Sequence, residues 1–398
     1  MNTLDAPLPL RHGQREGLHL RQVLRMIAIA CGLITLAGLF LSPDRVWGGF
    51  LMGFAYITVL ALAGPVFLAF LCMAGARWSI ALERILVAMS KALPVAGGLG
   101  LILLLGTHSL YEWSHPAAVE HDLILQDKAA WLNPTGFALR LVGVFLVWCL
   151  FARRLASLSA RYAQDPSEAL RRTRVRWSAA FIAVVAITFS IASIDWLMSL
   201  EPHWFSTMFP LLQFSGLGAA GLAAAILLTL RHERLGTLDA DLRDDHLHDL
   251  GKLLFSLTLL WVFCWYCQYM LIWYTDMPEE TVYYAARQKG QWWLLVQATI
   301  VVKWAVPFLA LMPRTLCRNR RVLMRISLLV LAGHALDLFV QVGPPLLGEV
   351  PYAGLWEIAP VVGAVALFFL LADAACPNPP RVTAQHPALR DSLSYRTP

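Results

Sequence analysis

The feature that most constrains the fold is a series of apolar runs, each long enough to cross a lipid bilayer. A helix of about 20 residues spans roughly 30 Å of hydrocarbon, and ten runs of this kind recur along the 398-residue chain. A backbone in hydrocarbon must satisfy its own hydrogen bonds, so we expect each run to be an α-helix. The predicted helices cover residues 23–42, 47–75, 86–107, 136–152, 177–200, 204–230, 250–274, 291–312, 322–342 and 353–373.

The predicted fold is therefore an all-α, polytopic membrane protein with ten transmembrane helices. Composition agrees, because 58% hydrophobic and 15% charged residues leave more apolar surface than a soluble core hides. We expect residues 1–22 to form a cytoplasmic N-terminal segment, 23–373 a single transmembrane domain and 374–398 a cytoplasmic tail. The first run lacks a small-residue cleavage site, so we expect a retained helix rather than a signal peptide.

The order of the runs suggests an internal repeat. Runs two to five, about 47–200, and runs six to nine, about 204–342, each start on the outer side and return to it. A shift of four helices therefore preserves orientation, although the two halves share little sequence. This order predicts two parallel-related four-helix bundles, with the first and tenth helices flanking them.

The distribution of positive charge indicates how the chain is oriented. The N-terminus, the connections 76–85, 153–176, 231–249 and 313–325, and the C-terminal tail hold most of the 32 Lys and Arg residues. The opposite connections hold Arg45, Lys128, Arg287 and Lys289. By the positive-inside rule, both termini are predicted to be cytoplasmic. The net charge of +6 is then a topology signal, and we expect no nucleic-acid partner.

No motif predicts a redox centre or a metal held by this chain. Cys264 and Cys267 are followed by Gln268 rather than by the histidine that a c-type haem requires. His334 is the one histidine near mid-depth, so paired haem ligation is not predicted. The histidines of residues 107–122 match no recognised metal-ligand spacing. Apart from a quinone, we expect this chain to bind no cofactor.

The most costly residues in the predicted spans are Lys303, His334 and Asp337. Lys303 follows Trp292 by eleven residues, which places it about 16 Å along the eighth helix and near the bilayer midplane. His334 and Asp337 fall at a similar depth on the ninth helix, so a Lys–Asp contact across the two helices would offset the burial of either charge. The group is interpreted either as an ion pair that locks two helices or as part of a proton or ligand path.

A second set of polar and aromatic residues gathers at the outer ends of the predicted helices. A carbonyl-bearing quinone head group that exchanges protons would suit such a rim, and so would a transported polar substrate. The set is Asp195, His203, Gln268, Tyr269, Tyr274 and Asp276.

Three stretches carry a resemblance to a known family. DWLMSLEPHWFSTMF (195–209), HDLGKLLF (248–255) and QYMLIWYTDMPEET (268–281) resemble signature stretches of one of the two large membrane subunits of bacterial alternative complex III. That complex is a quinol:cytochrome c oxidoreductase, and both of these subunits are members of the NrfD-like (polysulphide reductase membrane-subunit) superfamily. The likeness runs roughly from the second to the ninth predicted helix.

The resemblance implies a respiratory subunit of the bacterial cytoplasmic membrane, without a redox centre of its own. Its partners would be the homologous second membrane subunit, an iron-sulfur subunit, c-haem subunits, small membrane subunits and in some assemblies a terminal oxidase. Quinol, such as menaquinol, would be oxidised at the outer side. In this family the quinol pocket is better supported in the homologous second subunit, whereas the subunit that this chain resembles is a proposed proton route.

The resemblance also implies which residues line that route. Its motif positions are Asp195, Glu201 and His203 in the first stretch, His248, Asp249 and Lys252 in the second, and Gln268, Tyr269 and Tyr274 in the third. We hypothesise that Lys303, His334 and Asp337 form the middle of a path between the second stretch inside and the first outside. The alternative function is a stand-alone ion-coupled secondary transporter with a midplane Lys/Asp site, against which no pair of broken helices occupies corresponding positions in the two halves.

Overall fold

The computed structural model describes residues 12–76, 80–238 and 242–376. All regular structure in these residues is helical, and ten helices are long and apolar enough to cross a membrane. The predicted all-α polytopic class is therefore confirmed. Of the predicted terminal segments, residues 1–11 and 377–398 lie outside the described part of the chain.

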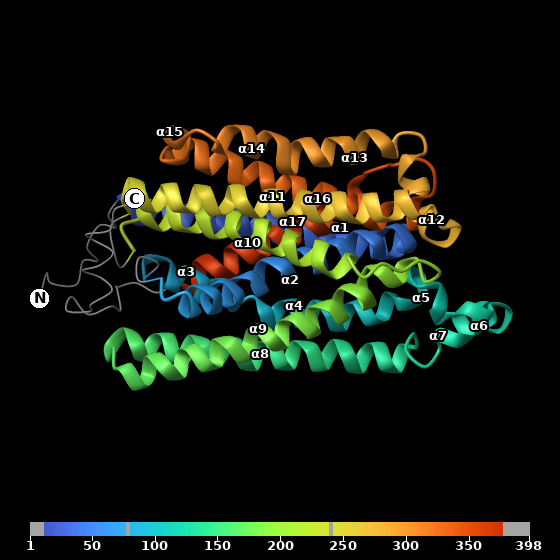
Figure 1. Cartoon of the computed structure of the whole chain (residues 1–398), viewed down its shortest axis with the longest axis horizontal. Coiled ribbons are helices and arrows are strands. Elements are labelled where there is room, and N and C mark those ends of the chain that lie inside the picture. The colour runs from blue at the N-terminus through green and yellow to red at the C-terminus, as the bar shows by residue number, and fades with distance from the viewer. Residues whose placement is uncertain (1–11, 77–79, 239–241, 377–398) are drawn as a thin grey trace, which may run out of the picture.

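Ten spans follow one another along the chain (Figure 1). Eight are single helices: α1 (His12–Leu41), α2 (Pro43–Met73), α8 (Pro134–Gln164), α9 (Glu168–Trp196), α10 (Phe209–Arg234), α11 (Asp244–Thr275), α16 (Arg320–Leu347) and α17 (Leu355–Ala375). The third span consists of α3 (Ile80–Ser90) and α4 (Leu93–Leu103), and the eighth of α13 (Trp292–Ile300), a π-helical segment (Val301–Ala305) and α14 (Val306–Leu311). Short helices lie in the connections: α5 (Thr107–Leu110), α6 (Pro116–His121), α7 (Leu123–Lys128), α12 (Pro278–Gln288) and α15 (Arg314–Cys317).

Helix boundaries differ from the predicted runs where polar residues continue or stop a helix. α8 extends to Gln164 and α9 begins at Glu168, because helical hydrogen bonding continues into polar sequence beyond the hydrocarbon. α10 begins at Phe209 rather than at residue 204, since Pro210 occupies the first turn, where its missing N–H has no partner to lose. Trp204 instead lies in the connection and stacks on Tyr283 with ring centroids 4.0 Å apart.

The core is built around α2 and α10. In the most apolar stretch of each of these helices, 83% of the residues are buried, compared with 6% in the corresponding stretch of α1. α1 packs on α17, and α17 packs on α2, so the first and last spans form a pair on the outside of the bundle (Figure 1). The two central helices are rich in small residues, which allow close approach: a Cβ on Gly64 of α2 would press on the backbone of Leu86 and Ser90 in α3.

Contacts between helices are dense within each half of the sequence. In the first half, residues 43–200, α2 contacts α3, α4 and α9, while α8 contacts α4 and α9. In the second half, residues 209–347, α10 contacts α11 and α16, α13 contacts α16, and α14 contacts α11. α10 also contacts α2 and α9, which joins the halves. The relation of the halves as parallel repeats stays a prediction.

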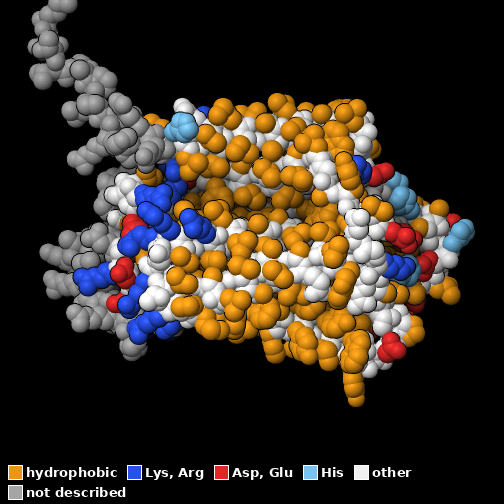
Figure 2. Space-filling model, turned by 90° about the horizontal axis from the view of Figure 1, so that it is seen from above, with side chains coloured by type: hydrophobic (Ala, Val, Ile, Leu, Met, Phe, Trp, Pro, Cys, Tyr) orange, Lys and Arg blue, Asp and Glu red, His pale blue; other side chains and the backbone are white. Residues whose placement is uncertain are grey.

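Charge separates to the two ends of the molecule. Figure 2 shows most of the Lys and Arg side chains of this face at one end, most of its histidine and acidic side chains at the other, and a broad apolar band between them. The start of α1 and the end of α17 share the basic end, since Arg21 donates hydrogen bonds to the Asp373 carboxylate and carbonyl. α6, α7 and α12 lie at the opposite, acidic end (Figure 1). Which end faces the cytoplasm stays a prediction from the positive-inside rule.

Candidate functional site

Lys303 lies in a π-helical segment of the eighth span. Pro307 follows four residues later and has no N–H to donate to the Lys303 carbonyl, so an α-helical hydrogen bond is missing at this point. The chain widens into the π-helical turns of Val301–Ala305. Such single π-segments often occur at functional sites, and here the segment contains a lysine whose side chain is fully buried.

The predicted contact between Lys303 and Asp337 is present. Lys303 Nζ donates to Asp337 Oδ2 at 2.5 Å and lies 3.1 Å from His334 Nδ1. The same ammonium lies 4.3 Å from the centre of the Trp261 ring on α11. Gly333 lets α16 approach closely, because an added Cβ would lie 2.9 Å from the Lys303 Cα. The eighth and ninth spans are therefore joined at mid-depth by a buried charge pair with a histidine beside it.

A chain of hydrogen bonds extends from this pair toward the acidic end. Gln341 Nε2 donates to Asp337 Oδ1 at 3.0 Å, and Gln341 Oε1 accepts from Gln213 Nε2 of α10 at 2.6 Å. The Gln341 carbonyl accepts from Arg287 at 2.7 Å. Residues from α10, α12, α16 and the π-segment thus form one connected polar network inside the second half.

Arg287 closes the network at the acidic end. α12 places this side chain inside the protein with only 2% of the residue exposed, where it bonds Glu201 at 2.8 Å and the Tyr283 carbonyl at 2.8 Å. Its guanidinium lies 3.4 Å from the centre of the Tyr283 ring. Burial raises the pKa of the Tyr283 phenol well above its usual range, so the ring stays neutral. A cavity of about 10 Å³ beside Glu201 and Arg287 has room for one water.

Three members of this network do not follow from the sequence. From the sequence, Arg287 is expected to be a charged residue in a surface loop. Residues 278–288 are too few and too polar to be recognised as a helix that packs inside the protein. Gln213 and Gln341 carry no charge, so no rule of membrane burial singles them out. The spacing of Gln341, four residues after Asp337 and on the same helix face, is the one signal available.

Toward the basic end, the polar groups lie apart. His334 Nε2, Ser327 Oγ and Thr58 Oγ1 are buried and have no hydrogen-bond partner among the described residues. Ser327 precedes His334 by seven residues, about 10 Å along α16. A proton moving from His334 toward the basic end therefore requires water between these groups.

The predicted inner end lies at the start of α11. His248 is buried, Asp249 is half-buried and Lys252 is exposed. His248 precedes Trp261 by thirteen residues, about 20 Å along the helix from the level of Lys303. The structure does not bring these three residues to the buried pair.

The predicted outer end divides between two places. Asp195 bonds to Arg140 at 2.5 Å and to the Trp131 ring nitrogen at 2.9 Å, and both partners belong to the first half. His203 contacts Asp122 at 2.5 Å, also in the first half. The hypothesis that Asp195 and His203 end the path is therefore revised, because the network reaches Glu201 instead.

The four predicted rim residues of α11 do not converge on one pocket. Gln268 is buried, and its amide has no hydrogen-bond partner in the described part of the chain. Tyr269 stacks on Trp265 with ring centroids 5.6 Å apart. Tyr274 is 82% exposed, and Asp276 is exposed where α11 ends in a left-handed residue. Successive residues of a helix face different directions, so closeness in sequence did not place them together.

Residues 12–76, 80–238 and 242–376 contain no group of three or more His, Cys, Asp or Glu side chains placed to hold a metal ion. The comparison with protein-family models finds no matching family. The search of curated proteins finds no match. The candidate site therefore rests on the geometry of the network alone.

Proposed function

We propose that this chain is a membrane subunit of a bacterial quinol:cytochrome c oxidoreductase and provides part of a proton route through the second half. The observation that carries the proposal is a fully buried lysine bonded to an aspartate at 2.5 Å, with a histidine 3.1 Å away. Such groups are costly in a membrane and typically mark ion or proton pathways. The three motif stretches support the respiratory context.

Each part of the network has a distinct chemical role in this proposal. Asp337, Lys303 and His334 exchange protons, whereas Arg287 holds its charge permanently and fixes Glu201. Gln341 and Gln213 hold the carboxylate and orient the chain of hydrogen bonds. Glu201 has 21% of its side chain exposed, so it joins the network to water at the acidic end. Protons would leave or enter there.

Electron transfer in this proposal belongs to partner proteins. The chain would assemble with a homologous membrane subunit, an iron-sulfur subunit and c-haem subunits, and quinol would be oxidised near the acidic end. The positive-inside rule supports a cytoplasmic position for the basic end, where the described ends of α1 and α17 lie.

The test replaces both members of the pair. Removing one charge leaves the other buried alone, which is strongly destabilising, whereas removing both leaves an apolar contact and is often tolerated. We expect the Lys303→Met/Asp337→Leu double variant to assemble with its partners and oxidise quinol in proteoliposomes while translocating fewer protons per electron. The matched control is Arg171→Met/Glu168→Leu, which removes an exposed ion pair at the basic end together with the contact of Glu168 to the exposed Arg172.

Unchanged proton translocation in the Lys303/Asp337 double variant would reject the route. Loss of quinol oxidation together with assembly would instead assign the pair a structural role.

The alternative function, an ion-coupled transporter, draws on the same midplane pair. Purification from native membranes separates the two. A c-haem spectrum and iron-sulfur signals in the isolated complex favour the respiratory subunit, and ion-coupled transport by the chain alone favours the transporter.

A further inference from the structure

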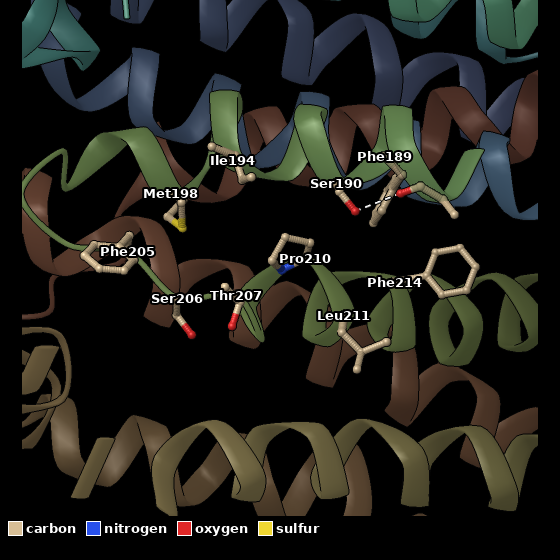
Figure 3. A pocket seen from close by; sticks show the side chains of 11 residues that line it. Phe189, Ser190, Ile194, Met198, Phe205, Ser206, Thr207, Pro210, Leu211 and Phe214 are labelled. Carbon is tan, nitrogen blue, oxygen red and sulfur yellow. Dashed lines mark hydrogen bonds between the residues drawn. The ribbon is translucent and has the colours of Figure 1, made fainter. Parts of the chain in front are cut away.

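A crevice of about 640 Å³ lies between α9 and α10, toward the acidic end (Figure 3). Its walls are mostly apolar and include Phe189, Ile194, Met198, Leu211 and Phe214. It is separate from the network described above, because the side chains of Lys303, Asp337 and Gln341 do not line it.

The crevice opens among side chains that face hydrocarbon. Ile187, beside its wall, is 65% exposed, while Phe205 and Leu211 in its lining are 56% and 48% exposed. These residues belong to the broad apolar band of a membrane-spanning protein, where the surrounding medium is lipid rather than water. An apolar hollow in this band is therefore filled by hydrocarbon.

The length and volume of the crevice indicate what kind of molecule it can hold. Its lining follows α9 from Ala186 to Ile194 and continues to Met198 in the 3-10 turn after that helix, twelve residues in all or about 18 Å at helical rise. One leaflet of the hydrocarbon core is about 15 Å thick. A partner helix of about 10 Å diameter occupies roughly 1,700 Å³ over four turns, far more than the crevice holds. A single acyl chain of one leaflet matches both the length and the volume.

Polar groups stand at the end of the crevice where a lipid head group would lie. Lys128 Nζ lies 6.0 Å from the centre of the Phe205 ring and donates to the Pro202 carbonyl. The Ser206 and Thr207 hydroxyls belong to the lining at the same end (Figure 3). A cation beside Phe205, together with hydroxyl donors in the lining, complements the phosphate and ester oxygens of a phospholipid.

We propose that the α9–α10 crevice binds one phospholipid, with an acyl chain along α9 and its phosphate at Lys128. The bound lipid would fill the junction between the two halves of the bundle, because α9 belongs to the first half and α10 to the second. The site does not depend on the proposed proton route.

A photoreactive phospholipid tests the site. Native membranes containing the full chain and its partners would be loaded with a phosphatidylglycerol that carries a diazirine in one acyl chain, irradiated, and analysed by peptide mass spectrometry. We expect labelling concentrated on residues 186–198 and 210–214. Unlabelled phosphatidylglycerol should compete with it in the wild-type protein, a result that requires no variant.

Two variants sharpen the test. Ser190→Trp fills the crevice from α9 and should abolish this labelling, whereas Leu309→Trp, at a 66% exposed residue of α14 away from the lining, should leave it unchanged. Lys128→Gln should reduce labelling about fivefold, the effect of one lysine beside an anionic head group.

Labelling spread evenly over all lipid-facing helices, or unaffected by Ser190→Trp, would overturn the proposal. So would competition by a long-chain quinone where unlabelled phospholipid fails, since the crevice would then select a different ligand.

Discussion

The Arg140–Asp195 pair of the first half and the Lys303–Asp337 pair of the second differ in the base that holds the acid. Two nitrogens of the Arg140 guanidinium donate hydrogen bonds to the Asp195 carboxylate, and the Trp131 ring nitrogen donates to the same carboxylate. Lys303 holds Asp337 and lies beside His334. Arginine keeps its proton under all ordinary conditions, whereas lysine, aspartate and histidine each exchange one.

The surroundings of the two pairs reinforce this contrast. Arg140 has 18% of its side chain exposed and lies over the Trp131 ring, 4.3 Å from its centre, at the acidic end. Lys303 is fully buried at mid-depth. Buried charge alone therefore does not identify a proton route: the first pair fixes a helix end, and the second has groups that can exchange protons.

The largest expected effect comes from removing one base from each pair. Lys303→Met leaves Asp337 unpaired in the protein interior and should lower the free energy of unfolding by about 3–5 kcal/mol. Arg140→Met should have a smaller effect, about 1–3 kcal/mol, because Arg140 has 18% of its side chain exposed and water reaches Asp195, whereas Lys303 is fully buried. Each carboxylate keeps one neutral donor, Trp131 on Asp195 and Gln341 on Asp337. Thermal unfolding in detergent measures both. Equal losses would remove the distinction between the pairs.

A glutamine substitution separates the pair from its link to the acidic end. Gln341→Leu leaves Gln213 and one Asp337 oxygen without a partner, and should destabilise the chain by about 1–3 kcal/mol. Proton translocation should fall while quinol oxidation continues. Gln291→Leu, at an exposed glutamine before α13, is the matched control. Normal translocation in Gln341→Leu would mean that protons reach Lys303 by another way.

A single methyl group tests the packing that brings α16 to Lys303. Gly333→Ala places a Cβ within 3.0 Å of the Lys303 backbone and should destabilise by about 1–3 kcal/mol through overpacking. Gly143→Ala on α8 meets no atom within 4 Å, so it should be neutral or slightly stabilising. The unfolding temperatures of the two variants measure this difference. An unchanged unfolding temperature in Gly333→Ala would show that α16 moves easily away from the eighth span.

The smallest expected effect is on the pH dependence of stability around Asp122, in the first half. The hydrogen bond with His203 holds the pKa of Asp122 below its usual value of 3.8. An aspartate whose pKa is lower in the folded than in the unfolded state stabilises the fold fully at pH values above its unfolded-state pKa. This stabilisation is lost as the pH falls through the folded-state pKa. His203→Ala should shift this loss to higher pH.

Amide exchange at Ile124 and Leu125, which donate to Asp122, reports the effect. His121→Ala, at an exposed histidine in the same connection, serves as the control. Identical pH profiles for the two variants would contradict the assignment.

The ten spans and the buried charges can be predicted from the order of residues alone. Apolar runs of membrane length leave the backbone little choice but helix, so ten spans followed from composition along the chain. The spacing of Lys303, His334 and Asp337 gave their depth, because helical rise per residue is constant. The cost of an unpaired charge in hydrocarbon then made a Lys–Asp contact the expected arrangement.

The connections between the polar groups depend on the packing of distant segments. Asp195, Glu201 and His203 are neighbours in sequence, yet Glu201 bonds Arg287 while Asp195 and His203 bond residues of the first half. Arg287 becomes a buried residue because α12 folds back against α16, a contact between distant segments with no local sequence signal. The α9–α10 crevice likewise depends on how residues of two helices and their connection pack together. Local patterns fix which segments enter the membrane, whereas side-chain partners depend on packing across the whole chain.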